Sequence, residues 1–392
     1  MKYDFKTRVN REGQGSYKWE DMHMKKANVS RGVVPLSVAD MEFQHPKKLI
    51  DGLCDHLRSA ILGYTGPTDA YMESVVSWMK RRHNFEIKKD WIVNTAGVVP
   101  AFFNAIRQFT NEGDGIIVMS PVYYPFYNAI NLQNRKVVDC PLIEKDGYYT
   151  INYELFDELS RKNKVLLFSS PHNPVGRVWK QEELEKLGDI IKKNNVMLLS
   201  DEIHFDLIMP GYEHTVFQTI DDEIADNMIT FTAPSKSFNI AGMGMSNIII
   251  KNEKIREKFI EGIKEISAAP CTAIGYKACQ IVYNECEDWL EECINVIDRN
   301  QRLVHEFFEK NYQDIKAPKI EGTYLQWIDF RSLGMDYEKL EDFMINKAEL
   351  FLDEGYIFGE NGRGFERINL AAPTEVIEEA LERLAKAIEA IK

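Results

Sequence analysis

Short apolar runs alternate with longer amphipathic segments along this chain, and the alternation limits the folds open to it. Runs of strand length, rich in aliphatic residues, lie at 115–120, 164–170, 196–202, 228–233 and 246–250. Segments such as QEELEKLGDIIKKNN (181–195) repeat leucine and isoleucine at three- and four-residue spacing, as an amphipathic helix does. Strand, helix and strand in repetition predict an α/β fold with a mostly parallel sheet whose faces are both covered.

The texture of the sequence changes near residue 287, where long charged helical patterns begin. Two strand-like runs follow, TYLQWIDF (323–330) and FERINLAA (365–372). A chain of 392 residues is more typical of two domains than of one. We therefore predict a large α/β domain over 45–286 and a smaller α+β domain built from 287–392 together with an N-terminal arm, 1–44.

Composition argues against several classes of partner. The formal net charge is −13, and the sequence contains no block of five or more basic residues, so we expect no nucleic-acid or anionic-lipid surface. The first residues, MKYDFKTRVNREG, are charged and form no signal sequence, and the apolar runs are too short to span a membrane. We expect a cytoplasmic protein.

The six cysteines form no CxxC pair, and three of them recur every seven residues, at Cys279, Cys286 and Cys293. On a helix this spacing separates neighbours by roughly 10 Å, too far for a disulfide or a shared metal. We predict buried thiols on one face of a single helix, no disulfide framework and no metal site, in keeping with a reducing compartment.

Polar residues follow three of the predicted strands. Asn173 lies in SSPHNPVG, Asp201 directly follows VMLLS, and Lys236 lies in APSKSF. Ligands bind beyond the carboxyl ends of strands in open α/β sheets, so these side chains are expected to meet at one edge. Taken singly, Lys236 could be a solvated loop lysine and Asp201 a capping or salt-bridged residue.

Together, Asp201 and Lys236 favour a more specific chemistry. An acidic group beside an apolar strand needs a cation or a donor, and a protonated pyridine nitrogen would supply one. A lysine across the same pocket could bond covalently to the other end of such a ring. These are the requirements of pyridoxal phosphate.

The motifs SSPHNPVG, SDEIH and APSKSFNIAG, in this order and spacing, resemble those of fold-type I pyridoxal-phosphate enzymes of the aspartate aminotransferase superfamily (class I/II). Further segments resemble its cystathionine β-lyase branch, the MalY/PatB-type C–S lyases. They are SYKWEDM (16–22), SVADMEF (37–43), LGYTGPTDAY (62–71), SPVYYPFYNAI (120–130) and GRGFERINLAAP (362–373). The resemblance covers nearly the whole chain and implies a seven-stranded-type sheet in the large domain.

The resemblance implies a role for each residue around the cofactor ring. Lys236 would bond to pyridoxal 5′-phosphate and act as the catalytic base, and Asp201 would pair with the pyridine nitrogen. Asn173 would donate to the phenolic oxygen of the ring. Tyr123 would stack on the ring face, although by composition it could equally be a core tyrosine. His204 stands where aminotransferases usually carry a tyrosine against the phenolic oxygen, and its alternative is a core histidine.

The cofactor phosphate needs donors, and a glycine turn before a predicted helix offers them. Free amides at Gly97 and Val98, aided by the helix dipole, suit a phosphate, although the same turn could merely join a strand to a helix. Ser235 would add a hydroxyl. Many aminotransferases place an arginine eight residues after the lysine, where this chain has Gly244. Tyr64 resembles a tyrosine that reaches the phosphate of the neighbouring subunit, which implies a homodimer with shared active sites.

An amino-acid substrate brings a carboxylate, which suits an arginine fork, and Arg367 in FERINL is the candidate. Arg363 is expected to be solvated. By resemblance, Ala39 and Asp40 belong to a segment that closes over the substrate, and Tyr324 is a further pocket candidate.

Three classes of function remain open. The first is a C–S β-lyase that cleaves L-cystathionine or other S-substituted cysteines to a thiol (homocysteine), pyruvate and ammonia. The second is an aminotransferase acting on an L-amino acid. The third is a non-catalytic regulatory protein that keeps the fold, and the joint presence of Lys236, Asp201 and Asn173 argues against it.

Overall fold

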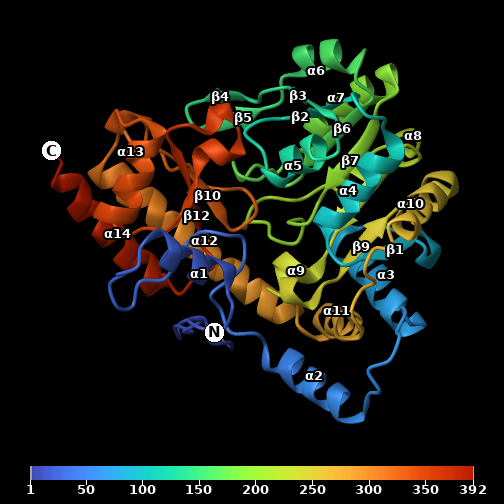
Figure 1. The fold of residues 1–392 in the computed structure, drawn as a ribbon, viewed down its shortest axis with the longest axis horizontal. Coiled ribbons are helices and arrows are strands. Elements are labelled where there is room, and N and C mark those ends of the chain that lie inside the picture. Colours follow the sequence, from blue (N-terminus) through green and yellow to red (C-terminus); the bar gives the residue numbers. More distant parts are fainter. Residues whose placement is uncertain (1, 392) are drawn as a thin grey trace.

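The computed structural model describes residues 2–391. Its central element is a seven-stranded sheet in the order β1-β9-β8-β7-β6-β2-β3, in which β9 runs antiparallel to both neighbours and the other pairs are parallel (Figure 1). The sheet strands are β1 (Ile92–Thr95), β2 (Gly115–Val118), β3 (Lys136–Asp139), β6 (Val165–Ser169), β7 (Met197–Asp201), β8 (Met228–Thr232) and β9 (Ser246–Ile249). The predicted mostly parallel α/β sheet is confirmed, with strands inside all five predicted runs.

Both faces of this sheet are covered because alternate strand residues point to opposite sides. Leu167 and Leu199 pack with one group of helices, and Leu166 and Leu198 with another. On the first face lie α4 (Val98–Phe109), α5 (Pro125–Asn131) and α10 (Glu253–Glu265). On the second lie α6 (Tyr153–Ser160), α7 (Gln181–Asn194) and α8 (Asp222–Ala225).

A second, three-stranded sheet has the antiparallel order β10-β12-β11. Its strands are β10 (Leu325–Asp329), β11 (Asp353–Glu354) and β12 (Phe365–Asn369), and a separate hairpin joins β4 (Ile143–Lys145) to β5 (Tyr148–Thr150). The helices around the smaller sheet are α12 (Glu287–Asn311), α13 (Tyr337–Asp342) and α14 (Thr374–Glu389). The N-terminal arm, with α1 (Tyr17–Lys25), lies beside these C-terminal elements (Figure 1). The domain boundaries at residues 45 and 287 stay a prediction.

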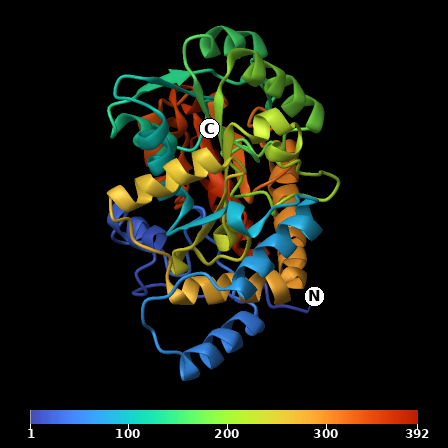
Figure 2. The same cartoon turned by 90° about the vertical axis from the view of Figure 1, so that its right-hand side faces the viewer.

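Three further helices lie at the far end of the large sheet: α2 (Lys47–Ser59), α3 (Asp69–His83) and α11 (Ala273–Glu285). Figure 2 shows α2 projecting away from the rest of the molecule. Among residues 2–391, none of the helices combines the length and apolar character needed to cross a bilayer.

The predicted single helix through Cys279, Cys286 and Cys293 is wrong. α11 ends at Glu285 and α12 begins at Glu287, so Cys286 lies at the break between two helices. The predicted burial of the three thiols is confirmed, and each packs in the same hydrophobic core. The heptad spacing continues across the break because Cys279 of α11, Cys286 between the helices and Cys293 of α12 all pack into the same core.

Candidate active site

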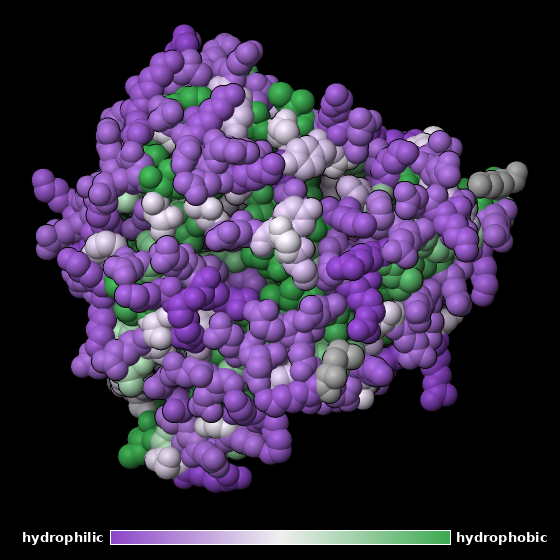
Figure 3. All heavy atoms as spheres, turned by 180° about the vertical axis from the view of Figure 1, so that it is seen from behind, coloured by the Kyte–Doolittle hydropathy of each residue, from purple (hydrophilic) through white to green (hydrophobic). Residues whose placement is uncertain are grey.

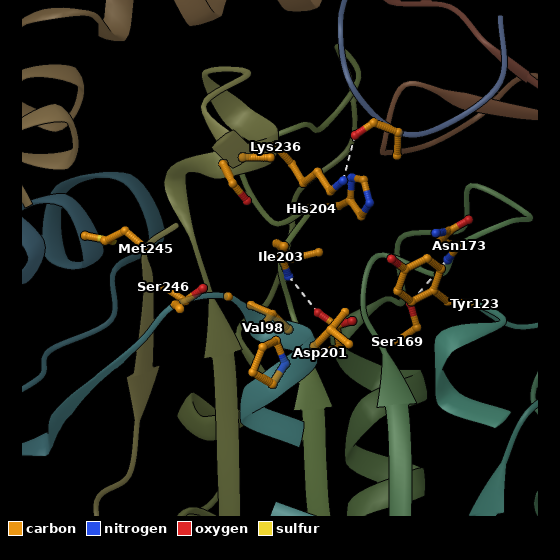
Figure 4. A pocket seen from close by; sticks show the side chains of 17 residues that line it. Val98, Tyr123, Ser169, Asn173, Asp201, Ile203, His204, Lys236, Met245 and Ser246 are labelled. Atoms are coloured by element: carbon orange, nitrogen blue, oxygen red, sulfur yellow. Dashed lines mark hydrogen bonds between the residues drawn. The ribbon is translucent and has the colours of Figure 1, made fainter. Parts of the chain in front are cut away.

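A pocket lies where the strands β6, β7 and β8 end, at the carboxyl edge of the large sheet (Figure 4). The register places Ser169, the last residue of β6, beside Asp201, the last residue of β7. β8 is followed at once by the short helix α9 (Pro234–Ser237), which carries Lys236. The pocket lining is Ala39, Ala96, Gly97, Val98, Val99, Pro100, Tyr123, Ser169, Asn173, Asp201, Ile203, His204, Ser235, Lys236, Ala241, Met245 and Ser246.

The structure therefore brings Asn173, Asp201 and Lys236 together, although they are far apart in sequence. Figure 4 shows Lys236 and Asp201 at opposite sides of one space, with Tyr123 and Asn173 on a third side. Nine of the sequence-predicted site residues line the pocket: Ala39, Gly97, Val98, Tyr123, Asn173, Asp201, His204, Ser235 and Lys236.

Lys236 is partly buried, and the loss of surrounding water lowers the pKa of its amine to about 8. Its Nζ donates a hydrogen bond to the carbonyl oxygen of Ala39 at 2.6 Å. The next residue, Ser237, donates from its hydroxyl to Oδ2 of the buried Asp206 at 2.5 Å. Asp206 also accepts a hydrogen bond from Trp78 Nε1 at 3.1 Å, and its Oδ1 lies 2.7 Å from His83 Nε2. Asp206 therefore links α9 to α3, which carries Trp78 and His83. No pattern in the sequence indicated this role of Asp206.

Asp201 is 5% exposed, and burial raises the pKa of its carboxyl to about 7. Within the described part of the chain its carboxylate accepts one hydrogen bond, from the backbone N–H of Ile203 at 3.2 Å. A carboxylate has room for several more donors. A ligand with a protonated ring nitrogen at this position would supply both the missing donor and the missing positive charge.

The opposite end of the pocket offers donors for an anion. α4 begins at Val98 after the N-cap Gly97, and the first N–H groups of a helix have no acceptor within it. Ser235 lies at the same pocket, and so does Ser246, whose buried hydroxyl oxygen has no hydrogen-bond partner among the described residues. Sequence reasoning missed Ser246. The available signal was its place as the first residue of a strand directly after the lysine loop.

Gly244 replaces the arginine that many aminotransferases use at the phosphate, and its backbone explains part of this difference. It has a left-handed φ of +58°, which favours glycine over a residue with a side chain. Among the described residues that line the pocket, Lys236 is the one lysine or arginine. The α4 amides and the serine hydroxyls are therefore the main protein donors at this end.

His204 and Tyr123 complete the walls. Burial lowers the pKa of His204 well below its ordinary value, so the ring is neutral, and its Nδ1 has no partner within residues 2–391. Its ring meets Tyr324 edge-on, with centroids 5.7 Å apart. Burial raises the pKa of Tyr123, which keeps its hydroxyl protonated. The unpartnered atoms of Ser246 and His204, together with Asp201, fit a polar, planar, anionic cofactor such as pyridoxal phosphate.

Four predicted residues lie outside the lining. Arg367 is buried behind Asn173: its Nη1 donates to Asn173 Oδ1 at 2.7 Å, and its Nη2 donates to Asp353 Oδ2 at 2.6 Å. The hydroxyl of Tyr324 donates to the Ala39 carbonyl at 2.8 Å. The other two are Asp40, whose side chain pairs with Arg11 and Lys18, and Tyr64.

Tyr64 is fully exposed, on the segment between α2 and α3. Ile61 and Leu62 beside it are also exposed. Figure 3 shows hydrophobic atoms at the bottom of the molecule, the end that α2 occupies in Figure 1. Arg363, by contrast, pairs at the surface with Glu360, as expected for a solvated residue.

Residues 31–384 match the family described as aminotransferase class I and II, and the chain belongs to this family. The predicted resemblance to its cystathionine β-lyase branch is also confirmed. Cystathionine beta-lyase PatB of Bacillus subtilis is 35% identical over 98% of this chain and 100% of its own length.

Two solved structures of similar proteins contain pyridoxal phosphate. Cystalysin from Treponema denticola, with a pyridoxal 5′-phosphate cofactor, is 62% identical over the full length of both chains, with a TM-score of 0.99. The PLP-bound C–S lyase from Staphylococcus hominis is 31% identical over 99% of this chain and 98% of its own, with a TM-score of 0.90.

Proposed function

We propose that this protein is a pyridoxal-phosphate-dependent C–S β-lyase that cleaves L-cystathionine or other S-substituted cysteines to a thiol, pyruvate and ammonia. The observation that carries the proposal is the pair Lys236 and Asp201. Asp201 is buried and Lys236 is partly buried, and the two face one pocket from opposite sides. Among residues 2–391, no ion pair involves Asp201, whose carboxylate accepts only the Ile203 amide. The names of the similar proteins support the same activity.

The residues that hold the cofactor follow from their positions. Asp201 would accept a hydrogen bond from the ring nitrogen, Asn173 and His204 would contact the ring substituents, and Tyr123 would stack on the ring. The phosphate would be held at the start of α4 by the backbone amides of Gly97 and Val98 and by the hydroxyls of Ser235 and Ser246. When bound, the cofactor supplies a ring that accepts the electron pair of a carbanion at substrate Cα.

Arg367 recognises the substrate carboxylate through its guanidinium, which Asp353 and Asn173 already hold in a fixed orientation. The Ala39 backbone closes the same side of the pocket, and Tyr324 holds the Ala39 carbonyl.

Lys236 would hold the bound cofactor through its amine, and the same amine would act as the base toward the substrate. Its pKa of about 8 leaves part of the amine unprotonated near neutral pH, and the free amine removes the Cα proton. The electron pair of the broken Cα–H bond then expels the thiolate from Cβ. With L-cystathionine and one water molecule, the products are homocysteine, pyruvate and ammonia.

Aminotransfer is the second candidate because it uses the same residues, and the family name covers it. The two reactions differ after the Cα proton is removed. The lyase loses a thiolate from Cβ, whereas aminotransfer would require the proton to be delivered to the cofactor. The lyase is favoured because the similar proteins described above are named for C–S cleavage. A non-catalytic regulatory role is disfavoured because the pocket retains its ionisable residues.

We also propose that the protein acts as a homodimer in which Tyr64 of one subunit completes the phosphate site of the other. Its full exposure beside exposed Ile61 and Leu62 supports this proposal, since such apolar residues favour a covering surface. Mixing inactive Lys236→Ala with a Tyr64→Phe variant should regenerate sites with both native residues and restore activity. Full activity in a monomer would refute the shared site. A cytoplasmic location remains part of the proposal.

Product analysis tests the lyase. Incubation with L-cystathionine alone should release pyruvate, ammonia and homocysteine in equal amounts. Lys236→Ala should release none, because it lacks the base. Undiminished turnover by that variant would refute the assignment of Lys236, and absence of pyruvate with the unmodified protein would refute the lyase.

A further inference from the structure

Lys18, in α1, is a lysine with 1% of its surface exposed, which is rare unless the ammonium is paired. Its Nζ lies 2.9 Å from Asp40 Oδ1 and 2.8 Å from Glu42 Oε1, and it also donates to the backbone carbonyl of Asp40 at 3.0 Å. These three oxygens take the place of the water molecules that would surround an exposed ammonium. Each of these contacts joins the Lys18 ammonium to Asp40 or Glu42.

Arg11 adds a second cation to the same two carboxylates. Its Nη2 lies 2.9 Å from Asp40 Oδ2, and its Nη1 lies 2.7 Å from Glu42 Oε1. We name Arg11, Lys18, Asp40 and Glu42 the arm cluster. Two positive and two negative charges balance within it. The charges of Lys18 and Arg11 outweigh the burial of Asp40 and hold the pKa of its carboxyl below the ordinary value.

The arm cluster explains why two motifs without a catalytic residue occur together in this chain. SYKWEDM supplies Lys18 and also Trp19, whose Nε1 donates to Glu42 Oε2 at 3.2 Å. SVADMEF supplies Asp40 and Glu42. The first part of the N-terminal arm, which carries Arg11 and Lys18, is therefore fixed to the segment 38–42 near the end of the same arm. This segment borders the pocket at Ala39.

The segment 38–42 needs such support because its backbone is unusual. Val38 has a φ of +50°, which a β-branched residue rarely adopts. Asn369 Nδ2 donates to the carbonyls of Val38 and Asp40 at 2.7 and 2.6 Å, and the N–H of Val38 donates to Asp353 Oδ2 at 3.0 Å. The segment is therefore held both by Asn369 and Asp353 of the smaller sheet and by Arg11 and Lys18 of the arm cluster.

The segment in turn contacts Lys236 and its loop. The Ala39 carbonyl accepts hydrogen bonds from Lys236 Nζ and from the Tyr324 hydroxyl. Asn239, three residues after the lysine, exchanges two hydrogen bonds with the backbone of Met41, at 2.8 and 2.9 Å. A displacement of the segment would therefore remove the acceptor of the lysine amine and loosen the loop that carries it.

We propose that Lys18 and Arg11 are positioning residues that hold the Ala39 carbonyl against the amine of Lys236. They touch neither substrate nor cofactor and act through Asp40 and Glu42. The inference deepens the proposed function, on which its kinetic part rests, by assigning the N-terminal arm a role in placing the catalytic amine.

The test compares the variants Lys18→Met, which removes the charge at similar length, and Lys18→Arg, which keeps it. The control is Arg8→Met. Arg8 ties the same arm to α14 through Glu379, at 2.5 Å, and does not touch the segment 38–42. Thermal unfolding of each full-length protein shows which variants are folded. If Lys18→Met does not fold, Glu42→Gln takes its place, because it weakens the same cluster without removing a cation.

The first measurement is the rate at which an amine-reactive reagent labels Lys236 in the full chain freed of cofactor, read by peptide mass spectrometry. Loss of the hydrogen-bonded position should change the labelling rate of Lys236 in Lys18→Met by about tenfold or more relative to exposed lysines. Lys18→Arg should largely restore the original rate, and Arg8→Met should leave it unchanged. An unchanged rate in folded Lys18→Met, or the same change in Arg8→Met, would overturn the proposal.

The second measurement is steady-state kinetics with L-cystathionine. A displaced base should lower kcat by about tenfold or more in Lys18→Met, with a smaller change in KM, and Lys18→Arg should recover most of it. Equal loss of kcat in Lys18→Met and Arg8→Met would indicate a merely structural role and refute the proposal. If the unmodified protein shows no elimination, the proposed function fails, while the labelling rate still decides whether the arm positions Lys236.

Discussion

Replacing Asp201 with asparagine should stabilise the cofactor-free protein while abolishing its function. In the folded chain the Asp201 carboxyl is buried with one backbone donor, and burial raises its pKa to about 7. The shape of asparagine is the same, and it carries no charge. The substitution therefore removes the cost of holding an ion in this pocket.

The sign and size of the effect follow from proton linkage. The folded pKa lies about three units above that of the unfolded chain, so the folded state binds more protons between pH 4 and 7, and its stability falls as the pH rises through this window. At about 1.4 kcal/mol per unit, the full penalty above pH 7 is about 4 kcal/mol. The charge of Asp201 also favours the protonated form of Lys236, and its loss reduces the expected gain to about 2–4 kcal/mol.

The assay is urea unfolding of both cofactor-free proteins from pH 4 to pH 8 at fixed protein concentration. The asparagine variant should gain little near pH 4 and most above pH 7. Asp206→Asn is the matched control, since that buried carboxylate already has donors from Ser237 and Trp78, and its replacement should destabilise the protein. An Asp201→Asn protein that is no more stable than the original at pH 8 would refute the reasoning.

Three further substitutions test other parts of the account. Ser246→Ala should weaken cofactor binding by about 5- to 30-fold in an absorbance titration, because one hydroxyl donor to an anion is lost. Its control is Ser170→Ala, which removes a buried hydroxyl outside the pocket and should leave binding unchanged. Arg367→Lys should raise KM for L-cystathionine by about tenfold or more, and an unchanged KM would exclude Arg367 from carboxylate recognition. Gly244→Ala should destabilise the protein by about 1 kcal/mol in thermal unfolding because of its left-handed φ, whereas Gly242→Ala, where φ is ordinary and space is open, should not.

The sequence predicted the parts of the site that follow directly from strand ends. Asp201 and Lys236 each come just after an apolar run, and the sheet rule that brings such positions together needs no further information. The strand runs themselves were predictable because buried parallel strands are nearly continuous in aliphatic residues. The seven-stranded order and the position of β9, antiparallel between β1 and β8, were not.

Contacts between distant segments could not be predicted from pattern alone. The pairing of Lys18 with Asp40 and Glu42 depends on how the N-terminal arm lies across the molecule, and no periodicity encodes that path. Ser246 was missed because its place at the start of a strand after the lysine loop is a weak signal by itself. The structure adds that its hydroxyl lies at the pocket without a partner among the described residues. The break at Cys286 was hidden because the heptad spacing continues across it.

The most direct test of the central claim compares two rates in one preparation of the protein. The first is pyruvate release from L-cystathionine without any 2-oxo acid, and the second is amino-group transfer from alanine or glutamate to a 2-oxo acid. Elimination should be faster by at least about tenfold, which corresponds to a barrier difference of ~1.4 kcal/mol between the two outcomes. Amino-group transfer that is faster than elimination from every S-substituted cysteine tried would contradict the lyase and establish the aminotransferase in its place.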